Sequence, residues 1–169
     1  MTTNALSTNT PAGAEFKKRE ADVIRWSSES WQCDAIVPLN PACGVDVIYH
    51  RDGKVGAVAE VKCRDRTLEK IRDFPTYMIE EGKLGVGIAF GQELGVPFYL
   101  IVQLSDGNVL TWHISDKSGN GLVRWKTGLR EVPATYEGGR TTKQMAYLPL
   151  EKAKCQHVPE FITNPGMEQ

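Results

Sequence analysis

The chain lacks an excess charge of either sign, a long hydrophobic run and any membrane-spanning pattern. Its 20 Lys and Arg residues and 21 Asp and Glu residues give a net charge of −1. A nucleic-acid partner would therefore be held by a local basic patch rather than by the overall field of the protein. The longest apolar stretch, residues 96–104, is interrupted by Pro97 and Gln103 and is shorter than the about 20 residues that cross a bilayer. These absences predict no membrane segment and argue against a nonspecific DNA coat.

Cysteine pairs and phosphate-binding loops are also missing. No C-x-x-C pair occurs, no histidine lies at zinc spacing, and the first residues lack the basic and then apolar pattern of a secretory signal. We therefore expect reduced thiols and a cytoplasmic protein. Gly82-Lys83 lacks the glycine spacing and the following Ser or Thr of a phosphate loop. The cysteines that we expect to be free are Cys33, Cys43, Cys63 and Cys155.

The length and the hydrophobic content fit one domain. At 169 residues and 41% hydrophobic, the chain can bury a core without metals or disulfides. We expect this domain at residues 14–158, between flexible tails at 1–13 and 159–169. Residues 14–26 have the periodicity of an amphipathic helix with one acid, Glu20, on its inward face; Glu15 on a neighbouring side is the rival for that role.

The rest of the pattern alternates between strands and helices. A glycine-rich segment at residues 82–94 favours a short helix. A buried strand at 97–102 is expected to form a hairpin with 109–114. This order predicts an α/β fold with a mixed central β-sheet flanked by helices. The other predicted strands are 35–37, 44–50, 55–63 and 145–150.

The two strands at 44–50 and 55–63 place acidic and basic side chains on one face. Alternate residues of a strand share a face, so Glu60 and Lys62 point the same way, and apolar neighbours leave Asp46 on that side as well. A two-residue loop would put Asp46 on the opposite face from Glu60. We therefore expect a three-residue loop at 51–53, with Asp46 diagonally next to Glu60, or an equivalent bulge.

Two carboxylates and a lysine so placed are suited to phosphodiester hydrolysis. Asp46 and Glu60 supply hard oxygens for Mg²⁺ or Mn²⁺, and the backbone carbonyl of Val61 is a further ligand. Such an ion neutralises phosphate charge and lowers the pKa of a bound water. Lys62, beside that water, can orient it or stabilise developing charge.

These residues resemble a known motif. G-V-D-V-I followed by A-E-V-K-C-R, after a helix with an inward glutamate, is similar to the PD-(D/E)xK nuclease superfamily, with Val45 in place of the usual proline. The resemblance implies a restriction-endonuclease-like core and metal-dependent cleavage of nucleic acid, most often DNA, in restriction, repair, recombination or phage functions. It also implies that the helix of Lys83 contacts the substrate. The residues that match the family's motif are Asp46, Glu60, Lys62 and Glu20.

Further cations are candidates for binding phosphate oxygens. Arg64 and Arg66 continue the strand beyond Lys62, and residues 138–143 read as a flexible loop that includes Arg140 and Lys143. The small size favours structure-selective or nonspecific cleavage of DNA, or targeting by a partner protein. We also expect the chain to act as a homo-oligomer or in a complex with a partner.

Two plainer interpretations remain open. In the first, Glu60 and Lys62 form a salt bridge without a catalytic role, and Asp46 is an acid on the side of the turn. The chain can also be a noncatalytic nucleic-acid-binding or assembly subunit that keeps the nuclease fold. Trp112 alternates with apolar residues and is expected in the core rather than on a base.

Overall fold

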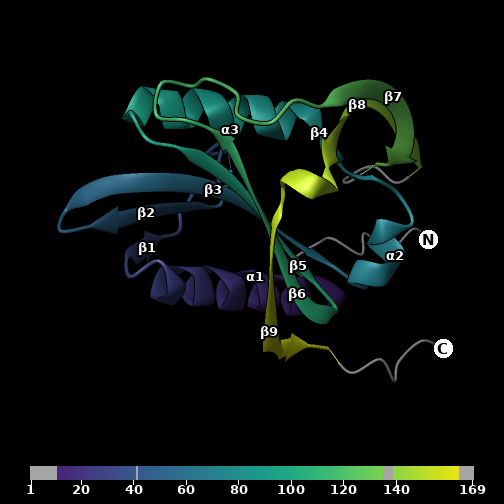
Figure 1. Cartoon of the computed structure of the whole chain (residues 1–169), viewed down its shortest axis with the longest axis horizontal. Helices are drawn as coiled ribbons and strands as arrows, with labels where there is room; N and C mark the ends of the chain where they lie inside the picture. The colour runs from purple at the N-terminus through teal and green to yellow at the C-terminus, as the bar shows by residue number, and fades with distance from the viewer. Residues whose placement is uncertain (1–10, 41, 135–138, 164–169) are drawn as a thin grey trace.

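The computed structural model describes residues 11–40, 42–134 and 139–163. A six-stranded mixed sheet has the order β1-β2-β3-β5-β6-β9, and a second, three-stranded sheet has the order β4-β8-β7 (Figure 1). The predicted α/β class with a mixed sheet flanked by helices is confirmed. No helix in the described part is long and apolar enough to cross a membrane. The elements are α1(Pro11–Ser30), β1(Asp34–Ile36), β2(Val47–Arg51), β3(Lys54–Arg64), α2(Leu68–Arg72), β4(Thr76–Glu80), α3(Glu81–Leu94), β5(Phe98–Leu104), β6(Asp106–Ser115), β7(Lys126–Pro133), β8(Arg140–Pro149), the 3₁₀ turn η1(Leu150–Lys152) and β9(Lys154–Ile162).

Both faces of the large sheet are covered, so there are two core clusters. Helix α1 packs on the face that includes Val47 and Tyr49, which is the core face expected from the alternating pattern. Helix α3 and the second sheet cover the other face, where Val58 and Phe98 are buried (Figure 1). Glu60 lies on this second face and is 1% exposed. Glu60 is therefore buried within a second core that the sequence did not predict.

The β2–β3 hairpin reaches the expected face by a different route. Asp52 and Gly53 form a two-residue loop with φ values of 52° and 73°, and Arg51 pairs with Lys54. The three-residue loop that we predicted is therefore wrong. A bulge next to Gly56 shifts the register, so that Val47 pairs with Ala59 at the far end of β2. This is the equivalent bulge, and it returns the even-numbered residues of both strands to one face.

Helix α3 lies close to the sheet because glycines face it. A Cβ atom at Gly87 would overlap the ring of Phe98. A Cβ atom at Gly91 would lie 2.8 Å from the carbonyl oxygen of Val96. Gly87 and Gly91 are thus required by the packing of this helix on the sheet. The helix ends at Gly95, whose φ of 68° is the left-handed C-terminal cap.

Several elements differ from the sequence prediction. Helix α1 begins at Pro11, inside the segment expected as a tail, and β9 extends to Ile162 in the other one. The predicted strand at 145–150 is the end of β8, which begins at Arg140, so the loop expected over Arg140 to Lys143 is wrong. Gly138 of that loop lies outside the described residues. Strands β4, β7 and β9 and the short helix α2 were not predicted. Trp112 is fully buried, as expected, and all four cysteines are free.

Candidate active site

The candidate site forms where β3 continues past the end of β2. Val47 and Ala59 are the last paired residues, and the backbone N–H of Asp46 still donates to the carbonyl of Ala59 at 3.0 Å. Two residues further along β3, the backbone N–H of Val61 donates to Asp46 Oδ2 at 2.8 Å. The carboxylate of Asp46 thus replaces a strand partner, which fixes it beside β3.

Lys62 lies at the centre of the acidic cluster. Its Nζ is 2.6 Å from Glu60 Oε1 and 3.7 Å from Asp46 Oδ2, and it donates to the carbonyl oxygen of Val61 at 3.1 Å. The three oxygens expected to bind a cation therefore surround one ammonium group. A second ammonium, Lys83 Nζ of α3, lies 3.7 Å from Glu60 Oε1. The salt bridge of the plainer interpretation is present, and Asp46 belongs to the same cluster.

Burial and charge act in opposite directions on these groups. Burial raises the pKa of Glu60, the charge of Lys62 lowers it, and the charge of Asp46 raises it again, with a net increase. Burial is the largest single effect and lowers the pKa of Lys62, but the nearby carboxylates of Glu60, Asp46 and Glu20 together outweigh it, so the pKa is raised overall. Lys62 is therefore protonated at neutral pH. It can donate hydrogen bonds to an anion or to a water, but it cannot accept a proton.

Glu20 on α1 completes the cluster of charges. It is half-buried, and burial raises its pKa, while the charge of Lys62 lowers it and the charges of Asp46 and Glu60 raise it. Its electrostatic neighbours are thus the other site residues. Glu15, the alternative helical acid, is exposed. The structure therefore brings Glu20 rather than Glu15 to the cluster.

A buried arginine that the sequence reasoning missed holds α1 in this position. Arg19 is 9% exposed, and its Nε and Nη2 donate to Gln103 Oε1 at 3.0 and 2.9 Å. Its Nη1 pairs with Asp65 at 2.5 Å. Arg19 therefore connects α1 to β5 and to the end of β3, and it precedes Glu20 directly. The polar Gln103 within an apolar strand was the available signal, but no spacing identified Arg19 as its partner.

The oxygens of this cluster fit a hard divalent cation. Among the described residues, Glu60 Oε1 is a buried side-chain oxygen that lacks a well-formed hydrogen bond, although it is close to Lys62. Carboxylate and carbonyl oxygens are the donors that Mg²⁺ and Mn²⁺ prefer. No group of three or more His, Cys, Asp or Glu side chains in the described ranges is arranged for a metal. A cation here would therefore rely on Asp46, Glu60, the carbonyl of Val61 and water.

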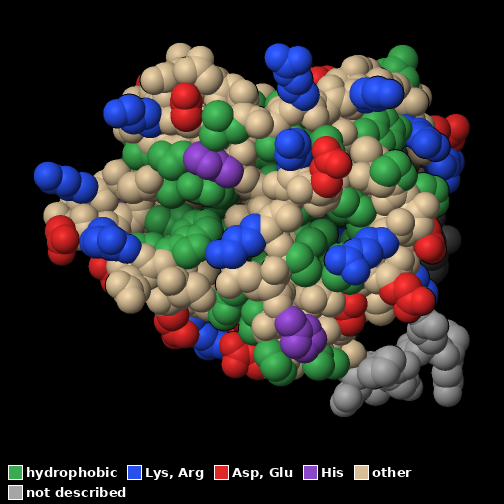
Figure 2. Space-filling view, viewed as in Figure 1, with side chains coloured by type: hydrophobic (Ala, Val, Ile, Leu, Met, Phe, Trp, Pro, Cys, Tyr) green, Lys and Arg blue, Asp and Glu red, His purple; other side chains and the backbone are tan. Residues whose placement is uncertain are grey.

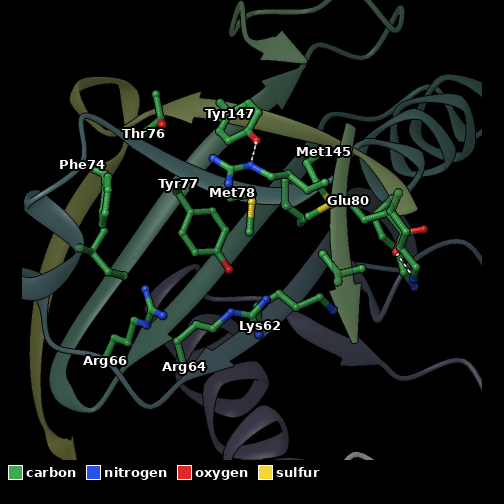
Figure 3. Close-up of a pocket in the computed structure, with 16 residues that line it drawn as sticks. Lys62, Arg64, Arg66, Phe74, Thr76, Tyr77, Met78, Glu80, Met145 and Tyr147 are labelled. Carbon is green, nitrogen blue, oxygen red and sulfur yellow. Dashed lines mark hydrogen bonds and ion pairs between the residues drawn. The ribbon is translucent and has the colours of Figure 1, made fainter. Parts of the chain in front are cut away.

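A cleft adjoins the cluster, between the end of β3 and the second sheet (Figure 3). Its volume is about 570 Å³. Arg140 lies outside it and pairs with Glu131 at 2.7 Å on the neighbouring strand. Arg130 of β7, which sequence reasoning did not single out, also lines the cleft. Of the cations expected to bind nucleic acid, the cleft includes Arg64, Arg66, Lys83 and Lys143.

A family comparison covers the segment that forms this site. A family model described as "Phage putative PDDEXK endonuclease" matches residues 12–130, a segment that includes α1, the β2–β3 hairpin and α3. No curated protein matches the chain. A solved structure, the Holliday junction resolvase Hjc of Archaeoglobus fulgidus, is similar at 16% identity with a TM-score of 0.43, over 57% of this chain and 70% of that one. The family match spans most of the chain and confirms the resemblance to the PD-(D/E)xK nucleases. The chain therefore belongs to the family of phage PDDEXK endonucleases.

Proposed function

We propose that this protein is a divalent-metal-dependent endonuclease that hydrolyses DNA, with Mg²⁺ as its ion and Mn²⁺ as a substitute. The observation that supports this most is the convergence of Asp46, Glu60 and the carbonyl of Val61 around Lys62 Nζ, beside a cleft lined by Lys and Arg. The family match supports the nuclease chemistry independently.

Each side chain has a distinct role in this proposal. A cation held by Asp46, Glu60 and the Val61 carbonyl would neutralise the phosphate and make a nearby water more acidic. Lys62, protonated and next to these oxygens, orients the attacking water and stabilises the charge that develops on the phosphate. Glu20 supplies an outer carboxylate that accepts a hydrogen bond from water. Lys83, 52% exposed and close to Glu60, contacts a substrate phosphate.

The net charge of −1 restricts how DNA is bound. Without a basic field over the whole protein, affinity rests on the local cations of the cleft. We propose that cleavage is therefore structure-selective or nonspecific, in the cytoplasm, with a second copy or a partner protein available for targeting.

A cleavage assay with matched lysine variants tests the proposal. Linear, circular, single-stranded and branched DNA is incubated with Mg²⁺, with Mn²⁺ or with EDTA, using the wild type, Lys62→Ala and Lys54→Ala. Lys54 is an exposed residue at the start of the same strand. We expect cleavage by the wild type only when the metal is present. The cleavage rate should fall about 100-fold or more in Lys62→Ala and should stay unchanged in Lys54→Ala. DNA binding without cleavage by the wild type would instead support a noncatalytic subunit.

Metal binding has a separate readout. Mn²⁺ binding is followed by electron paramagnetic resonance in the absence of DNA, for the wild type and for Asp46→Asn. We expect Asp46→Asn to weaken Mn²⁺ binding at least tenfold, because hard cations favour ionised carboxylates. Equal affinity in both proteins would contradict the proposed ligand set.

A further inference from the structure

The cleft beside the candidate site has an apolar lining that phosphate binding alone does not require. Phe74 is 62% exposed and Met78 is 41% exposed, and both line the cleft. Tyr77 and Tyr147 lie in the same wall, on β4 and β8 (Figure 3). Large apolar side chains that stay exposed around one cleft are typical of binding surfaces. A ligand that fits this lining would therefore need apolar faces.

The rim of this apolar surface is cationic. Figure 2 shows hydrophobic surface between Lys and Arg side chains on the face in view. The acid that lines the cleft is Glu80, and Lys143 neutralises it at 2.8 Å. The guanidinium of Arg66 has no ion pair with any described residue, so it is available to an anion. The lining cations are Lys62, Arg64, Arg66, Lys83, Arg130 and Lys143. A ligand that fits both the lining and the rim would therefore carry negative charge as well as apolar faces.

One hydroxyl inside the cleft, near the guanidinium of Arg64, also lacks a hydrogen-bond acceptor among the described residues. Tyr77 is 5% exposed, and its hydroxyl forms no hydrogen bond of adequate geometry in the described part of the chain. In Figure 3 this hydroxyl points toward Lys62 and Arg64. Burial raises the pKa of Tyr77, so the phenol stays protonated and can donate. A buried donor without an acceptor costs free energy unless a ligand supplies one.

We propose that this cleft binds an unpaired nucleotide of the DNA strand that enters the candidate active site. A paired duplex hides the faces of its bases, so only a single-stranded or extruded nucleotide can place a base against Phe74 and Met78 while its phosphates meet the Arg and Lys side chains. The volume of about 570 Å³ lies in the range of pockets that enclose one small ligand. This inference rests on the proposed nuclease function and adds a substrate class to it: DNA with an unpaired nucleotide next to the scissile phosphate.

Binding measured without cleavage tests the inference separately from the nuclease function. Fluorescein-labelled oligonucleotides are titrated in EDTA: a single strand, a blunt duplex and the same duplex with one bulged nucleotide. Phe74→Ala removes an exposed ring without opening the core. Leu129→Ala is the matched control, since Leu129 is 71% exposed on β7 and does not line the cleft. Tyr77→Phe removes only the hydroxyl.

We expect the wild type to bind the single strand and the bulged duplex about tenfold more tightly than the blunt duplex. Phe74→Ala should remove most of this preference, because stacking of one base on an aromatic ring contributes a free energy of about this size. Tyr77→Phe should reduce the preference for unpaired DNA about fivefold, which is the effect of one hydrogen bond. Leu129→Ala should leave this preference unchanged. Equal affinity for all three DNAs, or equal loss for all three in Phe74→Ala, would overturn the inference. A preference for unpaired DNA in the binding titration, together with no hydrolysis of any DNA in the cleavage assay with Mg²⁺, would contradict the nuclease proposal and leave the binding of an unpaired nucleotide by the cleft. Hydrolysis without that preference would do the reverse.

Discussion

Replacing Lys62 by Met should destabilise the metal-free protein more than replacing Glu60 by Gln. Glu60 is 1% exposed and Lys62 Nζ is 2.6 Å from its carboxylate. Removing the lysine leaves a buried carboxylate with Asp46 nearby, whereas removing the acid leaves an ammonium that is 21% exposed and still 3.7 Å from Asp46. Because the uncompensated charge is deeper in the first variant, that variant should be the less stable one.

The magnitude follows from the remaining partner of Glu60. Breaking a buried ion pair by removing one member costs about 3–5 kcal/mol. Lys83 Nζ remains 3.7 Å from Glu60 Oε1, but its side chain is 52% exposed, so it replaces only part of the lost attraction. We therefore expect Lys62→Met to lower the free energy of unfolding by about 3 kcal/mol at pH 8. Glu60→Gln should lower it by about 1 kcal/mol, the cost of a changed hydrogen bond.

The loss should also depend on pH in a defined direction. The pKa of Glu60 is already raised by burial, and removing Lys62 raises it further. A group whose pKa is higher in the folded state stabilises that state below its unfolded pKa, and this contribution is lost as the pH rises through the folded pKa. The deficit of Lys62→Met relative to the wild type should therefore be smaller at pH 5 than at pH 8, by about 1.4 kcal/mol for each unit by which the pKa rises within that window.

Urea unfolding in EDTA, followed by tryptophan fluorescence at pH 5 and pH 8, measures these differences. Lys54→Met serves as the exposed lysine control on the same strand and should stay near the wild type. The double variant Lys62→Met/Glu60→Leu should recover the stability lost in Lys62→Met, because replacing a buried pair by apolar groups is neutral or stabilising. Equal losses in Lys62→Met and Glu60→Gln at both pH values would refute the reasoning.

Two further predictions concern packing and thiol chemistry. Gly87→Ala should lower the free energy of unfolding by about 2 kcal/mol, because the added Cβ overlaps the Phe98 ring. Gly85→Ala, on the open side of the same helix, should raise it by about 0.5–1 kcal/mol; chemical denaturation compares the two, and a loss in both would contradict the packing argument. Burial raises the pKa of Cys63 to about 12, so Ellman's reagent at pH 8 should label exposed Cys155 in the native protein and reach Cys63 only after unfolding. Mass spectrometry identifies the labelled residues, and native labelling of Cys63 at the rate of Cys155 would contradict its burial.

The hairpin could be predicted because its information is local. Val47 and Tyr49 share one strand face, as do Ala59 and Val61, so Asp46 and Glu60 are left on the opposite face. The predicted assignment of side chains to the two faces was therefore correct, although the predicted loop was wrong. The sequence near the turn fixes an Asp-Gly loop, whereas the bulge that corrects the register is set by the covered faces of the sheet.

The parts that were missed depend on contacts between distant segments. In the second sheet, β4 ends at Glu80 and pairs with β8, which begins 60 residues further along the chain at Arg140, and β7 has a mostly exposed, mixed pattern without clear alternation. Arg19 and Gln103 are separated by 84 residues, and each alone resembles an ordinary polar interruption. No local sequence pattern therefore identified the second sheet, or identified Arg19 and Gln103 as partners that hold α1.

The position of Glu60 is best explained by use rather than by stability. An acid that is 1% exposed, with an oxygen that lacks a well-formed hydrogen bond, is held in a folded core only by ammonium groups. An apolar residue at this point of β3 would fill the same space without a desolvation cost. The same strand provides Val58 and Ala59, so the local pattern readily accepts apolar side chains. In the proposed function, a cation bound by Glu60 and Asp46 would give that cost a purpose, because it would supply the positive charge that the protein interior lacks.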